Sequence, residues 1–565
     1  MPDFAAELDS LTLRPPEQVM RLSRLGALHQ SRLSFMRQLT RRMSGPDWSF
    51  TCAEWSVDHT GVGHAVYLAK GPNHTYALVA FAHDLPPEAR SDRVIAEAWD
   101  ATFALFDGVP SAAEIARLAA NVPVQEAGRV SATELTLSRA NRSVRLWATV
   151  VDALSKGHQP DRTELEKIGY LMRTTAVYGS GKFGAADREA IADRPEFQNP
   201  FQAEMLTVYL IRTFVRDLVN HMAKAKGGAS AVSLDPDAAR SLGIGNSTGL
   251  GMAPFIVNHP ILFNNWITAR ETAIARVRAV KTATPEAKEL FRNVLDGARQ
   301  TVANWRTESP YLVDRVAILR AELDQVEAAT QNLPDTHPWD ALLRFTEESL
   351  SEEAQECVAS LILEPYPDLV DDLCGTMSDD RPGYFPIDGR MTLDTLRRSI
   401  EARYDWALDV DWAQDNTTAR VWYVSEEKLE PRLGERADEP LDAYEEPLAP
   451  GRDVARLYQA IADQPDETPI AELLLAHPEH RHAVRRIQAT DGAGYAEIRD
   501  NTVGASVLPI DMLRAKLSFF GATGFDPRSD RWVRICMFAG APYPDELTEE
   551  NCDLWVYPGV TGNGA

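Results

Sequence analysis

The feature that most constrains the fold is a long run of helical periodicity between residues 93 and 332. Apolar residues recur there at steps of three and four, the spacing of one face of an α-helix. Several of the segments begin with a proline in the first turn, where its missing N–H group is harmless. The segments that show the pattern are residues 95–106, 132–155, 163–177, 200–225, 260–280, 285–305 and 310–330. No alternating apolar strands interrupt them, so the sequence predicts a bundle of long antiparallel helices.

A short region rich in aromatic and β-branched residues comes before the helical run. Residues 49–57, 64–70 and 74–82 are separated by turn signals at 58–61 and 71–73, which is the pattern of strands joined by short turns. In the third segment, apolar side chains fall on both faces of a strand, so both faces have to be covered. The sequence therefore predicts a small antiparallel β-meander, and its two apolar faces are compatible with a homo-oligomer.

The segment before the meander carries the basic stretch of most interest. Apolar residues recur at helical spacing over residues 31–43, together with Arg37, Arg41 and Arg42. An amphipathic helix of this kind can dock on an anionic surface or pack on the body of its own protein. Acidic residues surround it in the rest of the chain, which favours packing on the body.

Composition changes after residue 333. Acidic residues cluster at 347–356 and 426–446, and helix-like and strand-like segments are mixed from residue 450 onward. The predicted fold class is therefore mainly α, a long helical bundle with a small N-terminal antiparallel β-meander and an α+β C-terminal region. The parts that we expect are residues 1–110, 111–334, 335–450 and 451–565.

The charge balance argues against two classes of partner. Lys and Arg total 58 against 83 Asp and Glu, a net charge of −25, so the chain repels nucleic-acid phosphates and anionic lipid surfaces. No window approaches the roughly 18 consecutive apolar residues of a membrane span, and the first residues lack a signal-peptide pattern. The 5 cysteines show no C-x-x-C spacing, which suits a reducing compartment. We expect a soluble cytoplasmic protein with no nucleic-acid or membrane partner.

Residues 243–252 form the densest candidate site. Glycines stand at 243, 245, 249 and 251. They allow a backbone to approach a ligand closely, so that N–H groups can hold a carboxylate or phosphate. We expect a loop in which Gly245, Asn246, Ser247 and Thr248 contact a small anion. The alternative is close packing or a tight connector, which needs glycine for space alone.

The residues that follow extend this candidate site. Asn258 and His259 come directly before the predicted helix 260–280, at the end where the helix dipole favours an anion and keeps a nearby histidine neutral. His259 can then serve as a general base, and Arg270 on the same helix can pair with the anion. The alternative is that Asn258 is a plain N-cap followed by a structural histidine.

A second glycine-rich segment lies upstream. Residues 178–184 read Tyr-Gly-Ser-Gly-Lys-Phe-Gly and satisfy the G-x-G-x-x-G pattern. That pattern marks a dinucleotide site when it follows a strand, whereas the preceding residues here predict a helix. Lys182 and Arg188 can still meet an anionic substrate, and Tyr178 can act as an acid if Lys182 lowers its pKa. The alternative is a glycine helix stop with a solvated lysine.

The meander also carries four histidines, His59, His64, His74 and His83. Paired strands can bring imidazoles together, and imidazole is the commonest metal ligand. Metal binding is nevertheless the weaker alternative here, because the spacing matches no defined site.

These candidates favour an enzyme that acts on a small polar or anionic molecule. Acid–base chemistry of a lyase or isomerase type fits them, with Tyr178, Lys182 or His259 moving the proton. One alternative is an oxidoreductase that uses a flavin or nicotinamide cofactor, and another is a non-catalytic helical scaffold. The sequence assigns no cofactor.

Overall fold

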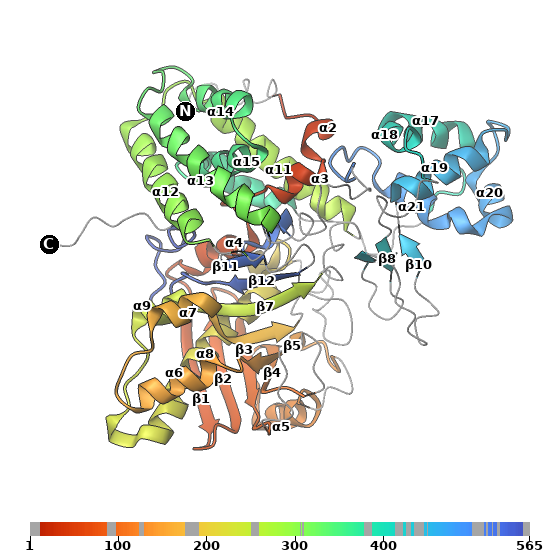
Figure 1. Cartoon of the computed structure of the whole chain (residues 1–565). Helices are drawn as coiled ribbons and strands as arrows, with labels where there is room; N and C mark the ends of the chain where they lie inside the picture. The colour runs from red at the N-terminus through yellow and green to blue at the C-terminus, as the bar shows by residue number, and fades with distance from the viewer. Residues whose placement is uncertain are drawn as a thin grey trace.

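The centre of the protein is one large curled β-sheet, seen below the helical layer in Figure 1. The computed structural model describes residues 12–86, 98–123, 129–175, 191, 193–249, 259–305, 307, 310–377, 387–412, 422–424, 431–433, 446–448, 450–499, 514–515, 518–522, 524–527 and 532–557. Within these residues the sheet has nine strands in the order β1-β2-β3-β4-β5-β6-β7-β12-β11. Their bounds are β1 Ser49–Val57, β2 Gly63–Lys70, β3 Thr75–Ala82, β4 Ala101–Asp107, β5 Glu134–Arg142, β6 Tyr170–Thr175, β7 Gly243–Gly249, β11 Gly524–Pro527 and β12 Trp532–Met537.

The predicted fold class, mainly α with a small N-terminal meander, is wrong. The three predicted strands are confirmed as β1, β2 and β3, but the sheet continues into β4, β5 and β6. Those strands overlap segments 95–106, 132–155 and 163–177, which the periodicity predicts as helices. A short apolar run fits a buried strand as well as a buried helix, and pairing with neighbouring strands decides between the two.

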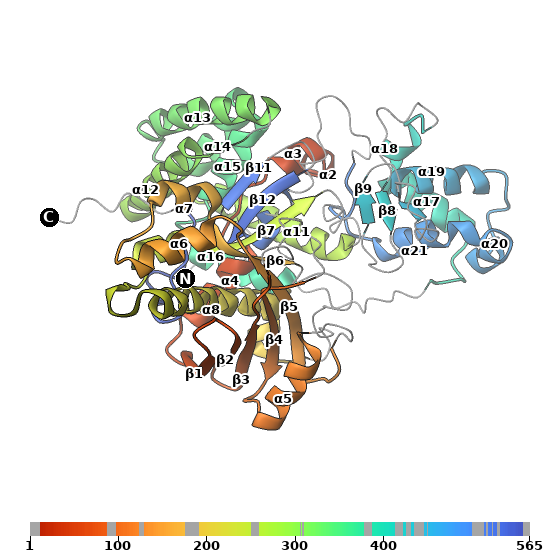
Figure 2. The same cartoon turned by 60° about the horizontal axis from the view of Figure 1, so that its bottom comes forward.

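Helices cover both faces of the first half of the sheet, as the apolar third strand requires. The long helix α8 (Gln202–Gly227) packs across β2, β3, β4 and β5 on one face, with α6 (Leu146–Ser155) beside it (Figure 2). The short helix α5 (Ala112–Asn121) covers the other face, where Leu118 and Val122 meet Val66, Val79 and Leu137. The expectation that both faces are covered is confirmed.

A helical layer lies on the far side of β12 and β11 (Figure 1). It confirms the predicted helices 260–280, 285–305 and 310–330, each of which begins with proline as expected. The elements of the layer are α11 Pro260–Arg278, α12 Pro285–Ala303, α13 Pro310–Thr330, α14 Pro338–Ser349, α15 Glu352–Leu361, α16 Pro367–Val370 and the 3-10 helix η6 Asp371–Met377. No helix in the described part of the chain is long and apolar enough to span a membrane.

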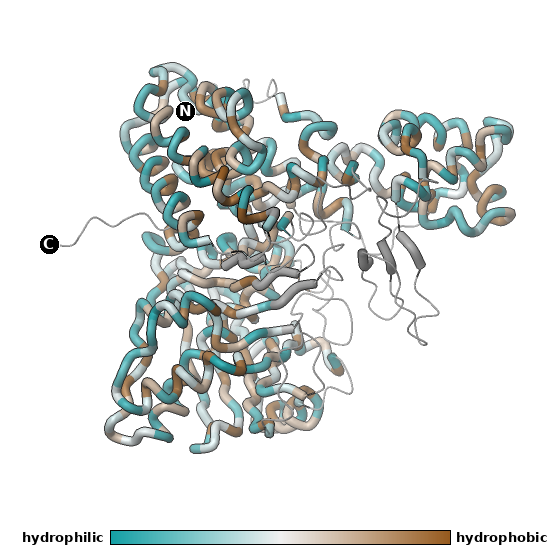
Figure 3. Tube along the Cα trace, in the orientation of Figure 1, coloured by the Kyte–Doolittle hydropathy of each residue, from teal (hydrophilic) through white to brown (hydrophobic). Residues whose placement is uncertain are grey.

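A smaller helical cluster has its own hydrophobic core. That core is made of buried side chains between Leu393 and Ile487 and is separate from the main one. Figure 3 shows hydrophobic stretches both in this cluster and in the helical layer. The elements here are α17 Leu393–Arg403, α18 Asp405–Leu408, α19 Pro450–Ile461, α20 Ile470–Ala476 and α21 Arg481–Ala489, with a three-stranded sheet of β8 Trp422–Val424, β9 Pro431–Leu433 and β10 Glu446–Leu448.

An N-terminal arm, residues 12–43, runs against the helical layer. It contains α2 (Pro16–Val19), α3 (Leu22–Gly26) and α4 (Phe35–Met43). Helix α4 carries the basic stretch and is largely buried, with Arg37 only 1% exposed. The prediction that this helix packs on the body of the protein is confirmed.

Buried ion pairs hold the first half of the arm. The Arg14 guanidinium donates to Glu271 on α11 at 2.7 Å and to Glu356 on α15 at 2.7 Å. Arg24 and Arg270 donate to the two carboxylate oxygens of Glu356, each at 2.6 Å. Burial raises the pKa of Glu356, but the charges of Arg14, Arg270 and Arg24 outweigh burial and hold it well below its usual range. We call these five residues the α15 ion-pair network.

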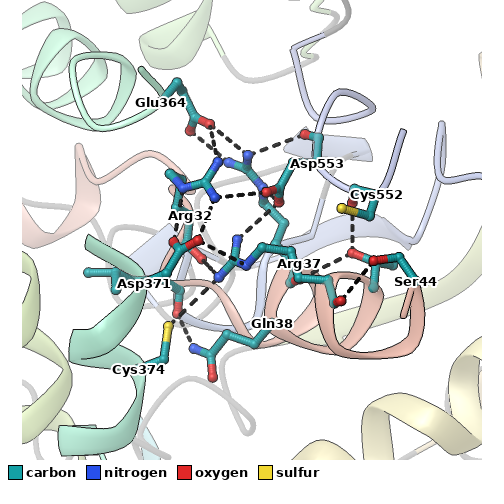
Figure 4. A network of polar contacts seen from close by, with 12 residues as sticks. Arg32, Arg37, Gln38, Ser44, Glu364, Asp371, Cys374, Cys552 and Asp553 are labelled. Carbon is teal, nitrogen blue, oxygen red and sulfur yellow. Dashed lines mark hydrogen bonds and ion pairs between the residues drawn. The ribbon is translucent and has the colours of Figure 1, made fainter. Parts of the chain in front are cut away.

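A second set of ion pairs holds α4, and we call it the α4 ion-pair network. Figure 4 shows the arginines Arg32 and Arg37 reaching Glu364, Asp371 and Asp553. Arg37 donates two parallel bonds to Glu364, both at 2.6 Å, and a third to Asp553 at 3.2 Å. The arm is therefore fastened both to the helical layer and to a segment near the C-terminus.

The arm also contains a buried histidine whose charge is tied to pH. The His29 imidazole lies 2.9 Å from a Glu353 oxygen. Burial lowers the pKa of His29, but its interactions with Cys357 and Glu353 outweigh burial and raise it to about 9. A raised pKa adds stability that is complete below the unfolded value of about 6.5 and is lost as the pH rises through the folded value.

We therefore expect the free energy of unfolding to fall by about 1–3 kcal/mol between pH 6.5 and 9 through this residue. Urea titrations at a series of pH values will measure the fall. In His29→Gln the fall should shrink by this amount, and an unchanged pH profile in the variant would contradict the assignment.

Candidate functional site

Strands β6 and β7 are the parallel neighbours in a sheet whose other described pairs are antiparallel. Tyr170 lies opposite Gly243, and Arg173 lies opposite Gly245. Parallel strands point their carboxyl ends to the same edge, and ligands of mixed and parallel sheets bind at such edges. Strands β6 and β7 therefore end toward the same edge of the sheet, at Thr175 and at Gly249.

A group of polar side chains lies on one face of the sheet near the end of β6. Arg139 on β5 stands opposite Thr102 and Thr175, and Asn141 stands opposite Arg173. Because side chains alternate along a strand, these groups share the face that carries Leu137. Arg139 and Arg173 are diagonal neighbours, which places their Cβ atoms within roughly 8 Å.

The side chains around this group are partly or fully buried. The Arg139 guanidinium lies 4.0 Å from the ring centroid of Trp99, and burial lowers the pKa of Arg139. Arg173 is 8% exposed. A cation on an aromatic ring in such a setting gains attraction from the ring quadrupole. Two arginines held here favour an anionic ligand.

A histidine lies on the same face of the sheet, next to Thr102. His83 follows β3, and its ring nitrogen lies 3.1 Å from the hydroxyl oxygen of Thr102, the residue opposite Arg139. Burial lowers the pKa of His83, so the imidazole is neutral at pH 7 and is able to accept a proton. We define the polar face as His83, Thr102, Arg139, Asn141 and Arg173.

The prediction of a loop over residues 243–252 is wrong for its first seven residues, which form β7. The backbone here pairs with β6 and β12, so most of its N–H groups belong to the sheet. Gly245 is explained by packing, since a Cβ atom there would lie 2.3 Å from the Tyr170 ring. Asn246 is 3% exposed inside the protein. Ser247 and Thr248 lie in β7, and their side chains are outside the described residues.

The packing at Gly245 gives a direct prediction. Gly245→Ala forces the Tyr170 ring to move, which is expected to lower the free energy of unfolding by about 1–3 kcal/mol. Gly375→Ala is the matched control, because a Cβ atom there meets no described residue within 4 Å, and it should change stability by less than about 0.5 kcal/mol. Chemical denaturation of both variants tests this, and equal effects would show that β7 does not pack against Tyr170.

The remaining predicted site residues fall in several places. His259 is the N-cap position of α11, although its side chain does not cap the helix. Arg270 is fully buried, and its guanidinium bonds Glu356 at 2.6 Å and Glu271 at 3.2 Å. The Arg270 guanidinium is therefore paired with carboxylates inside the α15 ion-pair network. Four further residues lie outside the described part of the chain: Tyr178, Lys182, Arg188 and Asn258.

The four histidines of the meander have different surroundings. His64 lies 2.9 Å from Glu54, His74 lies 2.9 Å from Glu196, and His83 contacts Thr102, while His59 is in the turn after β1. Within the residues that the structure describes, no three His, Cys, Asp or Glu side chains gather in a way that could hold a metal ion.

The residues that the sequence reasoning missed are Arg139, Arg173 and Trp99. Arg139 and Arg173 were read as helical positions, where they lie on no common face. The alternation of Leu135, Leu137 and Arg139 was the available signal for a strand. The two arginines lie together because their strands pair with each other. The residues next to each arginine in the sequence do not determine which strand it pairs with.

Comparison with known proteins adds no family to this description. No protein-family model, no curated protein and no solved structure matches the chain.

Proposed function

We propose that this chain binds a small anionic molecule on the polar face, at the carboxyl ends of β6 and β7. The observation that carries the proposal is the parallel pairing of these strands, with Arg173 opposite Gly245. It brings the last residues of the two strands, Thr175 and Gly249, to one edge of the sheet, on the side where Arg139 and Arg173 lie. Edges of this kind collect ligands because loops from neighbouring strands converge there.

The chemistry that we propose is acid–base catalysis of a lyase or isomerase type. Arg139 and Arg173 pair with the anion, and the neutral His83 is added as a candidate base. The sequence-based candidates for proton transfer remain Tyr178, Lys182 and His259. Arg188 and Asn258 remain candidates for substrate binding. The pairing with the substrate anion that was predicted for Arg270 is proposed instead for Arg139 and Arg173.

Arg173→Gln tests the binding role directly. Loss of a charged hydrogen-bond partner typically costs about 1.5–3 kcal/mol, so the affinity for the anion should fall by about ten- to a hundredfold. A thermal-shift screen of anionic metabolites identifies the ligand, and isothermal titration compares the two proteins. Arg398→Gln, at a side chain that is 75% exposed, is the control and should bind like the wild type. An equal affinity of Arg173→Gln and wild type would contradict the proposal.

A cofactor-dependent oxidoreductase is the second candidate, and one observation favours it. Residues 178–184 follow strand β6, not a helix, which meets one requirement of a dinucleotide fingerprint. Native mass spectrometry beside a denatured sample, with an absorbance scan, separates the two candidates. A released flavin or nicotinamide nucleotide would support the redox reading, and a cofactor-free protein would support acid–base chemistry.

The cellular setting that we propose is the cytoplasm. The cysteines are free thiols, four of them buried, as is usual in a reducing compartment. The net charge of −25 disfavours nucleic-acid and membrane partners.

A homo-oligomer is also proposed, because the edge strand β1 of the sheet is mostly exposed and exposed edge strands readily pair with another copy. Native mass spectrometry reports the oligomeric state in the same experiment.

A further inference from the structure

Three buried hydrogen-bond donors near α11 have no acceptor among the residues that the structure describes. They are the Nε atoms of Arg24 and Arg270 and the indole Nε1 of Trp266. Arg270 and Trp266 are 0% exposed and Arg24 is 5% exposed. A buried donor without an acceptor costs about 1–3 kcal/mol, and more when the group is charged. Such groups in a native protein normally mark a water or an ion.

Two of the three donors are neighbours, and the third lies on the same helix as one of them. Arg24 and Arg270 hold the two oxygens of the same Glu356 carboxylate, each at 2.6 Å, so their guanidinium groups are neighbours. Trp266 lies one helical turn before Arg270 on α11, and residues four apart share a helix face. The ring of Trp266 is fixed by Phe263 and Phe519, at centroid distances of 6.0 and 5.3 Å.

The charges at this place favour an anion over a water. Arg14, Arg24 and Arg270 contribute three positive charges, while the buried carboxylates are those of Glu271 and Glu356. Glu352 reaches Arg24 at 3.5 Å, but its side chain is 41% exposed and is shared with water. The buried part of the network therefore carries one more positive than negative charge, and a desolvated excess charge is expensive unless it is paired.

We propose that the α15 ion-pair network contains a binding site for a small monovalent anion of halide size, held by Trp266 Nε1, Arg270 Nε and Arg24 Nε. Every side chain of the site is at least nine-tenths buried, so an anion bound there would be shielded from water. The anion completes the charge balance between the N-terminal arm, α11 and α15. This site is distinct from the polar face, and the proposal does not depend on the proposed function.

Bromide is the probe that tests the site. In crystals grown with sodium bromide, an anomalous peak is expected within hydrogen-bonding distance of Trp266 Nε1 and Arg270 Nε. In solution the melting temperature should rise with bromide and should not rise with gluconate at the same ionic strength, because gluconate is too large to enter and an anion that binds only the folded state stabilises it.

Trp266→Phe is the matched variant, since it keeps an aromatic ring and removes one donor. The concentration of bromide that gives half of the stabilisation should rise at least tenfold, by the size of a hydrogen bond to a charged group. Absence of an anomalous peak at the three donors would overturn the proposal. A bromide effect of equal size in wild type and Trp266→Phe would also overturn it, and wild-type diffraction alone decides the question if the variant does not fold.

Discussion

Glu356→Gln is expected to lower the free energy of unfolding by about 3–5 kcal/mol, because it removes one partner of a buried ion pair and leaves the others uncompensated. Glu356 accepts bonds from Arg14, Arg24 and Arg270 at 2.6–2.7 Å, and its side chain is 0% exposed. Glutamine keeps the volume and loses the charge, so three arginines would share the single buried carboxylate of Glu271. The loss is a large share of the 5–15 kcal/mol that typically stabilises a folded protein.

Glu352→Gln is the control for this prediction. Glu352 is on the same helix and contacts Arg24 at 3.5 Å, but it is 41% exposed, so its loss should cost less than about 1 kcal/mol. Urea denaturation of both variants gives the two free energies. A small effect of Glu356→Gln, similar to that of Glu352→Gln, would mean that the N-terminal arm does not depend on the α15 ion-pair network.

Arg37→Met is expected to have a comparable effect, about 3–5 kcal/mol, in the α4 ion-pair network. Methionine keeps the aliphatic part of the side chain but leaves Glu364 and Asp553 without the bonds that Arg37 donates at 2.6 and 3.2 Å. Arg398→Met on the surface, where Arg398 is 75% exposed, should change stability by less than about 0.5 kcal/mol. Denaturation curves again measure the difference.

The same variant should change the response to acid. Burial raises the pKa of Asp553, but the charges of Arg37, Arg41 and Arg32 hold it well below its usual range. A depressed carboxyl pKa adds stability above the unfolded value of about 4, and that stability is lost as the pH falls through the folded value. Wild type should therefore keep this contribution well below pH 4. Arg37→Met should unfold at a higher pH, and an unchanged acid midpoint would contradict the assignment.

The parts of the fold that sequence patterns predicted well are those with local signals. Helices α11, α12 and α13 begin with proline and are long enough for periodicity to be unambiguous. The strands β1 to β3 were marked by turns of a few residues between them. In both cases the residues that decide the structure lie close together in the chain.

The parts that were predicted wrongly depend on distant residues. Strand β6 spans six residues and follows directly on the helix α7 (Arg162–Ile168), so the apolar spacing of the two merges into one helix-like pattern. Strand β7 pairs on one side with β6 and on the other with β12, almost 300 residues later. Its glycines resemble a ligand-binding loop, because glycines that give space to a neighbour and glycines that admit a ligand are alike in sequence.

In the candidate site, too, the features that were predicted wrongly depend on residues far apart in the chain. Gly245 was predicted to contact an anion, whereas the structure explains its missing side chain by the Tyr170 ring packed against it. Arg270 was predicted to pair with an anion, and its partners are the carboxylates of Glu271 and Glu356, the second of which lies 86 residues away. The two arginines of the polar face come together only through the pairing of β5 with β6, which no local pattern encodes.

The measurement that tests the central claim most directly is a crystal structure of the chain with the anionic metabolite found by the thermal-shift screen. The account predicts the anion within hydrogen-bonding distance of the Arg139 and Arg173 guanidinium groups, at the carboxyl ends of β6 and β7. An anion bound elsewhere, with the polar face unchanged, would contradict it.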